Sequence, residues 1–109
     1  MNYKILISRE AEKDIAAAAD YIEFTLFNPK AAIDMLDLID EKVSKLARSP
    51  KVHPVADDPV LRPLGIRFVP IKNYLAFYVI DEGSKTVHLV RFLYGKRNWI
   101  SLLKNTSSE

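Results

Sequence analysis

The spacing of hydrophobic residues changes along the chain, and each spacing predicts a different element. Residues 3–7, with the sequence YKILI, are rich in β-branched and aromatic side chains and predict a short strand that ends at Ser8. From residue 9 to about residue 27 the apolar positions recur every three or four residues, which predicts an amphipathic helix. The apolar stripe of this helix consists of Ala11, Ile15, Ala18, Ile22 and Leu26.

A second helix is predicted directly after a break at residues 27–29. Asn28 is a favourable N-cap and Pro29 suits the first helical position. This helix should run from Pro29 to about Arg48, because the Ser-Pro pair at residues 49–50 ends it. Its apolar stripe consists of Ala32, Leu36, Ile39, Val43 and Leu46. Two amphipathic helices joined by a short break should pair antiparallel and bury both stripes on a common surface.

The rest of the chain predicts a sheet. Residues 51–63 contain three prolines and predict a loop, after which the apolar spacing falls to two. Strands are predicted at residues 65–71, 73–81 and 86–94, and the middle strand is apolar on both faces, as in the centre of a sheet. Residues 95–103 predict a short terminal helix with inward-facing residues Trp99, Leu102 and Leu103.

This order of elements predicts the fold class. A β-αα-βββ order favours an α+β fold in which an antiparallel sheet carries the helix pair on one face. We expect residues 1–105 to form a single domain with one hydrophobic core and hardly a second, and residues 106–109 to be a frayed tail.

Composition excludes several classes of function. The chain of 109 residues has no cysteine, so neither disulfides nor Cys-ligated metals are expected. The two histidines, His53 and His88, have no ligand partner at metal spacing, and the three glycines form no phosphate-binding loop, so we expect no cofactor. No apolar run reaches the about 18 residues that span a bilayer, and none suits a signal peptide, which favours a cytoplasmic protein without a membrane partner.

The net charge of +2 is distributed unevenly. Residues 1–61 carry eight Lys/Arg and eleven Asp/Glu, a net charge of −3, whereas residues 62–109 carry eight and three, a net charge of +5. The second part could therefore meet a polyanion or an acidic protein. The alternative is that these basic residues only keep a small sheet protein soluble.

The predicted last strand ends in a cationic corner. Strict alternation places Val87, Leu89, Arg91 and Leu93 on one face, and His88, Val90, Phe92 and Tyr94 on the other. Arg91 is then either paired with a carboxylate near the core edge or directed into a basic concavity. Gly95 allows a sharp turn, and Lys96 and Arg97 follow beside Tyr94 and Trp99, which suits phosphate contact and stacking. Arg62, Arg67 and Lys72 could join this corner if the sheet curls.

Two segments carry a resemblance to a known family. The runs LGIRFVPIKNYLAFYVID at residues 64–81 and VHLVRFLYGKRNW at residues 87–99 resemble the RelE/ParE superfamily of bacterial type II toxin–antitoxin toxins, and the similarity extends over about residues 3–103. The resemblance implies a toxin that arrests growth, as in plasmid stabilization systems. It also implies a cognate antitoxin protein that neutralises the toxin in a hetero-oligomer.

The molecular target divides this superfamily. RelE-type members cut mRNA on the ribosome, whereas ParE-type members inhibit DNA gyrase. If the chain is RelE-like, the resemblance assigns catalysis to Arg67, Tyr94, Lys96 and Arg97. The RelE arginine that follows the strand tyrosine falls here on Leu75, and its C-terminal tyrosine falls near Leu103, which cannot transfer a proton.

These two replacements favour the ParE-like interpretation, in which gyrase inhibition needs no enzymatic activity. The target-binding residues would then be Lys72, Arg91, Lys96, Arg97 and Trp99. Trp99 has the alternative of closing the end of the core. A degenerate toxin that acts only as an antitoxin-binding module, and an inert domain with basic strands, remain further alternatives.

Overall fold

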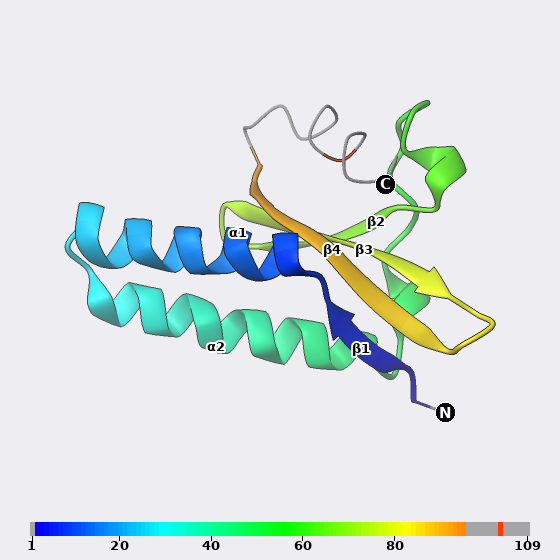
Figure 1. The fold of residues 1–109 in the computed structure, drawn as a ribbon, viewed down its shortest axis with the longest axis horizontal. Helices are drawn as coiled ribbons and strands as arrows, with labels where there is room; N and C mark the ends of the chain where they lie inside the picture. The colour runs from blue at the N-terminus through cyan, green and yellow to red at the C-terminus, as the bar shows by residue number, and fades with distance from the viewer. Residues whose placement is uncertain (1, 96–102, 104–109) are drawn as a thin grey trace.

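The computed structural model describes residues 2–95 and 103, and the predicted terminal helix and tail otherwise lie outside the described residues. Figure 1 shows a sheet with both long helices on one face, the predicted α+β architecture. In chain order the elements are strand β1 (Lys4–Ile7), helix α1 (Arg9–Asp20), π-helical turn η1 (Tyr21–Thr25), helix α2 (Pro29–Leu46), 3-10 turns η2 (Pro50–Val52) and η3 (Arg62–Leu64), and strands β2 (Arg67–Ile71), β3 (Tyr74–Asp81) and β4 (Thr86–Tyr94).

Both helices begin where the sequence predicts. The Ser8 hydroxyl accepts a hydrogen bond from the Ala11 N–H, and the Asn28 side chain accepts one from the Ala31 N–H. Each cap satisfies a backbone donor that the first helical turn leaves without a partner. The first helix ends differently from the prediction, because its last turn widens into the π-helix η1 before the chain reverses at Phe27.

The sheet has the order β1-β4-β3-β2, and one of its three pairings is parallel. The pairs β2–β3 and β3–β4 are antiparallel, as predicted, whereas β1 lies parallel to β4. The helix hairpin causes this arrangement because it returns the chain to the start of β1, where the Tyr3 N–H donates to the Ala47 carbonyl. Strand β2 therefore starts at the same end of the sheet as β1. The chain reverses between β2 and β3 and again between β3 and β4, so β4 runs in the same direction as β1. The expectation of a wholly antiparallel sheet is thus wrong for β1.

Both faces of the sheet are covered. The main core lies between the sheet and the helices. Of the predicted stripe of α2, Ile39, Val43 and Leu46 belong to it and Ala32 is buried, whereas Leu36 is exposed and the neighbouring Met35 is buried in its place. A second cluster covers the opposite face, and it consists of Ala56, Leu61, Ile66, Phe77, Leu93 and Leu103. The chain was expected to bury only one core, and this expectation is wrong. The proline-rich loop folds back over the sheet and supplies Ala56 and Leu61 to the second cluster. The inward-facing position predicted for Leu103 is confirmed.

A β-bulge at Val90 changes which side chains of β4 face the helices. Phe77 pairs with Arg91 and Tyr78 pairs with Leu89, so Val90 is an extra residue on β4. Leu89 and Phe92 therefore both belong to the main core, although they lie three positions apart. Val90 still packs on the opposite face from Leu89, as predicted, but the strict alternation is wrong for the residues after Val90, because an extra residue reverses their faces.

One buried hydrogen bond ties the sheet to the segment that follows α2. Tyr78 is fully buried, and its hydroxyl donates to the Pro50 carbonyl over 2.6 Å. Burial raises the pKa of Tyr78 to about 12, although Arg67 acts in the opposite direction. The neutral phenol is therefore the form that the fold stabilises.

We expect Tyr78→Phe to lower the free energy of unfolding by about 1–3 kcal/mol, because it leaves the buried Pro50 carbonyl without its donor. Equilibrium urea unfolding at neutral pH measures this effect. Tyr21→Phe is the matched control, because Tyr21 is about half exposed, and it should change the stability by less than about 0.5 kcal/mol. Equal effects of the two substitutions would contradict the role given to this bond.

The same tyrosine predicts a loss of stability at alkaline pH. Its pKa rises from 10.0 in the unfolded chain to about 12 in the folded protein, so its contribution is complete below pH 10 and is lost as the pH rises towards 12. Over this range we expect a loss of up to about 1.4 kcal/mol per pH unit. Urea unfolding across this range should show a shallower decline for Tyr78→Phe than for the unsubstituted protein.

Candidate functional site

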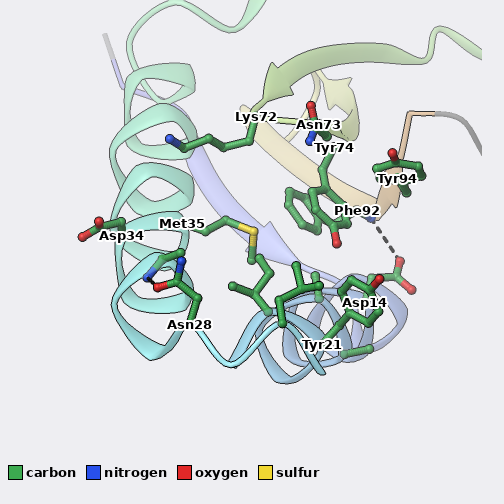
Figure 2. Close-up of a pocket in the computed structure, with 15 residues that line it drawn as sticks. Asp14, Tyr21, Asn28, Asp34, Met35, Lys72, Asn73, Tyr74, Phe92 and Tyr94 are labelled. Atoms are coloured by element: carbon green, nitrogen blue, oxygen red, sulfur yellow. Dashed lines mark hydrogen bonds between the residues drawn. The ribbon is translucent and has the colours of Figure 1, made fainter. Parts of the chain in front are cut away.

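A groove opens where the helix hairpin extends beyond the sheet. Helix α2 spans 18 residues, about 27 Å, whereas β2 spans five, about 17 Å. In Figure 1 the joined ends of α1 and α2 accordingly project past the strands. The resulting cavity of about 780 Å³ lies between the hairpin, the β2–β3 turn and the end of β4 (Figure 2). Its lining includes Asp14, Tyr21, Leu26, Asn28, Asp34, Met35, Lys72, Asn73, Tyr74, Phe92 and Tyr94.

Aromatic rings from neighbouring strands form one wall of the groove. Tyr74 and Phe92 stack with ring centroids 4.9 Å apart and planes 7° apart. Tyr94 meets Tyr74 edge to face, with centroids 5.6 Å apart. Such pairs gain energy beyond the area they bury, and they hold each ring in one orientation. This wall suits a flat or apolar group of a partner.

Burial raises the pKa of Tyr74, and the neighbouring Tyr21 and Tyr94 raise it further. A tyrosine whose pKa lies above its ordinary value remains protonated at neutral pH. The Tyr74 hydroxyl can therefore donate a hydrogen bond in the groove, but it is a poor general base.

Asp14 forms the edge of the groove and has three bonds to β4. Its carboxylate accepts hydrogen bonds from the Arg91 Nε at 2.7 Å and the Arg91 Nη2 at 3.0 Å. It also accepts one from the backbone N–H of Phe92 at 3.0 Å. The side chains of Arg91 and Asp14 are only 15% and 13% exposed. The bond to Asp14 raises the pKa of the Arg91 guanidinium. Of the two positions that the sequence leaves open for Arg91, the structure shows the carboxylate pair.

The structure brings two of the predicted site residues together in the groove and places Arg67 and Arg62 outside it. Lys72 and Tyr94 line the same groove, and Lys72 occupies a left-handed turn position with φ 58°. Arg67 begins β2, and its Nη1 donates to the His53 carbonyl at 2.6 Å. Arg62 pairs with Asp57 in the loop on the other side of the sheet and does not line the groove.

Gly95 connects the groove residue Tyr94 to the basic residues Lys96 and Arg97 in the sequence. The Gly95 N–H donates to the Asn73 carbonyl at 2.8 Å, and a Cβ on Gly95 would lie only 3.3 Å from that oxygen. Glycine therefore permits the close approach of β4 to the β2–β3 turn. Lys96, Arg97 and Trp99 lie outside the described residues, so their target-binding and catalytic roles stay predictions.

Comparison with known families shows which family the chain belongs to. The sequence model of the ParE toxin of type II toxin–antitoxin systems, from parDE, matches residues 5–99. The chain belongs to the ParE toxin family. No curated protein matches it closely enough to assign a relative.

Three of the solved structures that share this fold show the extent of the similarity. A chain in the chromosomal ParDE system of P. aeruginosa is 19% identical to this toxin, with a TM-score of 0.67, and the match covers 84% of this chain and 95% of that one. The toxin–antitoxin complex RelBE2 of Mycobacterium tuberculosis gives 18% identity, a TM-score of 0.60 and coverage of 86% and 99%. A mutant of the E. coli toxin RelE in the free state gives 9% identity, a TM-score of 0.67 and coverage of 98% of both chains.

The two positions at which this toxin departs from the RelE pattern lie on the face away from the helices. Leu75 packs against the second cluster, and Leu103 is a fully buried member of it. Both are therefore structural apolar residues. The groove, in contrast, lies on the helix side of the sheet.

Sequence reasoning missed the toxin's groove and the residue that closes its edge. Asp14 lies with Glu10 and Glu12 in the first turns of α1, where acidic residues are favoured by the helix dipole and therefore do not stand out. The available signal was Arg91, an arginine within an apolar strand that needs a carboxylate. The chain has 14 Asp and Glu residues, and only the tertiary structure selects Asp14 among them.

We expect Asp14→Asn to destabilise this toxin by about 3 kcal/mol, because the amide cannot balance the buried guanidinium of Arg91 and places donors against it. Asp34→Asn is the matched control, since Asp34 forms an exposed pair with Lys30 that contributes less than about 1 kcal/mol. Urea unfolding of both variants measures the difference. Similar losses would show that the Asp14 pair does not stabilise the fold more than a surface pair.

Proposed function

We propose that this toxin arrests growth by binding DNA gyrase and that a cognate antitoxin neutralises it. The observation that supports the gyrase interpretation is an incomplete cleavage set in the part of the chain that the structure describes. Arg67 bonds to the His53 carbonyl, whereas Leu75 and Leu103 pack against or within the second cluster. A protein that acts by binding needs no such set.

RNA cleavage makes chemical demands that the described part of the groove meets poorly. Attack by the RNA 2′-hydroxyl needs a proton acceptor, cations beside the phosphate and a donor to the leaving oxygen. Within residues 2–95 and 103, the carboxylates that line the groove are already engaged, Asp14 with Arg91 and Asp34 with Lys30. The raised pKa of Tyr74 keeps this tyrosine protonated at neutral pH, so it cannot take the proton, and Lys72 is the groove's one described cation. Binding, in contrast, uses the aromatic wall and Lys72 directly.

The charge distribution supports an acidic partner. Residues 62–109 carry a net charge of +5, from eight Lys/Arg and three Asp/Glu, and they include Lys72 and the corner residues Lys96 and Arg97. Complementary charge speeds association and selects partners. We infer that the basic part faces acidic segments of gyrase or of the antitoxin, both in the cytoplasm. The ParDE and RelBE2 structures are of toxin–antitoxin systems, which supports a hetero-oligomer for this chain as well.

A RelE-like mRNA endoribonuclease is the second candidate. The match to E. coli RelE extends over 98% of both chains, and Tyr94 lies in the same groove as Lys72. In this alternative Tyr94 would transfer the proton, and Arg67, Lys96 and Arg97 would stabilise the phosphate. The two candidates therefore differ in whether the Tyr94 hydroxyl is essential.

We expect purified toxin to inhibit supercoiling by DNA gyrase and to leave ribosome-bound mRNA intact. Lys96→Ala combined with Arg97→Ala should weaken inhibition at least about tenfold, the effect of losing about 1.4 kcal/mol of binding free energy. Tyr94→Phe should keep most of the inhibition, because its ring remains in the aromatic wall. Lys45→Ala, which removes an exposed lysine on α2, is the charge control and should act like the unsubstituted toxin.

Contrary results would favour the alternatives. New mRNA ends that depend on ribosomes and disappear in Tyr94→Phe would establish the endoribonuclease and exclude our proposal. Binding of the antitoxin without effect on gyrase, mRNA or growth would leave only the antitoxin-binding module.

A further inference from the structure

A second cavity lies at the end of α2 that is remote from the groove. It has a volume of about 530 Å³ and is framed by the last turns of α2, by η2 with the residue after it, and by β2. The groove takes its α2 residues from the first half of the helix, so the two cavities lie towards opposite ends of α2 (Figure 1). The polar lining of the second cavity, which we name the basic pocket, consists of Lys42, Lys45, Arg48, Ser49 and His53.

The basic pocket is cationic although it lies in the acidic part of the sequence. Residues 1–61 carry eight Lys/Arg and eleven Asp/Glu, yet residues 42–56 contain four Lys/Arg and no Asp/Glu. Three of these four cations line the pocket, and among the described residues no carboxylate lines it. The fourth, Lys51, pairs with Glu82 over 2.6 Å. The pocket therefore collects positive charge that its own lining does not neutralise.

Two of the pocket cations have no intramolecular anion. Within residues 2–95 and 103, neither Lys42 nor Arg48 forms an ion pair, and Lys45 comes only within 3.8 Å of Glu41. The helix dipole favours a cation in the last turn of α2, which accounts for Lys45 but not for Lys42, because Lys42 precedes that turn. Like charges repel at short range, so three cations around one hollow cost free energy that a bound anion recovers.

His53 lies in this positive surrounding. Burial lowers the pKa of His53, and the charge of Lys42 lowers it further. Lys45 and Arg48 line the same pocket, and Arg67 of β2 donates to the His53 carbonyl at 2.6 Å. All these charged groups are cations, so the described residues place no negative charge in the pocket with the imidazole.

We propose that the basic pocket binds a phosphate group. Lys42 and Arg48 carry hydrogen-bond donors and no acceptors, and their charge strengthens each bond to a phosphate oxygen. The Ser49 hydroxyl and a ring N–H of His53 complete a set of donors on the same hollow. The site lies outside the groove, and the inference does not depend on the target of the toxin.

Phosphate suits the basic pocket better than a carboxylate does. A single arginine satisfies a carboxylate, whereas phosphate groups offer more acceptor oxygens and draw several cations together. Lysine, arginine and serine are also side chains that contact phosphates in nucleic-acid interfaces. The volume of about 530 Å³ lies within the range of small-molecule sites, which leaves room for a nucleoside next to the phosphate. Free phosphate, a nucleotide and a nucleic-acid backbone share this chemistry.

Phosphate binding should be coupled to protonation of His53. A negative charge in the pocket favours the imidazolium form, so the pKa of His53 should rise when phosphate binds. By linkage, the affinity should increase as the pH falls through the range in which this histidine titrates.

NMR titration of the two histidine rings of the full toxin tests the proposal. The probes are inorganic phosphate and an oligothymidylate of about ten nucleotides, a length typical of single-strand sites, each added at constant ionic strength. We expect at least one probe to raise the pKa of His53 by about one unit. His88 is the internal control, because it lies on β4 outside the pocket, and its pKa should not change.

Lys42→Ala combined with Arg48→Ala should raise the dissociation constant of the active probe at least about tenfold, because two charge-assisted contacts are lost. Lys13→Ala combined with Lys30→Ala is the matched control. It removes the same net charge from exposed helix positions that line neither cavity, and it should bind like the unsubstituted toxin. Lys42→Gln with Arg48→Gln retains more of the side-chain packing and replaces the alanine pair if its melting temperature falls.

The two probes distinguish the source of the phosphate. A shift of the His53 resonance by both probes at similar concentrations indicates free phosphate, and a shift by oligothymidylate alone indicates a nucleic-acid backbone. An oligothymidylate that binds without moving the His53 resonance occupies another surface, and this result would overturn the proposal. It would also be overturned by an unchanged His53 pKa with both probes, or by equal losses of affinity in the pocket and control variants.

Discussion

The carboxylate of Asp14 is the contact on which the end of β4 and the wall of the groove depend. Strand β1 covers the edge of β4 only from Thr86 to Leu89, and beyond that point β4 has no neighbouring strand on this side. Helix α1 replaces the missing strand. The Ser8 hydroxyl donates to the Val90 carbonyl, and Asp14 accepts from the Phe92 N–H. Backbone groups of β4 that would otherwise lack partners are thereby satisfied by the N-cap Ser8 and by Asp14 of α1.

This substitution of a helix for a strand also explains the bulge. An edge without a strand can accept an extra residue, and Val90 occupies that position. The bulge turns Phe92 towards the helices, while Arg91 reaches Asp14. The pair is stabilising only while it is complete, because either charge alone would be buried without compensation. The same interaction thus fixes the strand register, the position of α1 and the aromatic wall of the groove.

In the function proposed above, this toxin works through its surface. The aromatic wall of the groove would provide apolar contact, and the basic residues that follow β4 in the sequence would provide charge. Such a combination is typical of protein interfaces, in which a few buried aromatic anchors supply most of the affinity and charge selects the partner. A toxin of this kind can be neutralised by any partner that covers the same surface, which requires no change in its chemistry.

The sequence by itself determined the elements and the family. The signals for the elements are local: the capping residues Ser8 and Asn28, and the helical and alternating spacing of apolar residues. Local backbone preferences therefore largely determine where the helices and strands form. The signals for the family are the runs at residues 64–81 and 87–99. The parallel pairing of β1, the bulge, the choice of Asp14 as the partner of Arg91, and the groove were decided only by the tertiary structure. Each of these depends on residues far apart in the chain, and hydrophobic periodicity carries no information on which of several equivalent strands or carboxylates will meet.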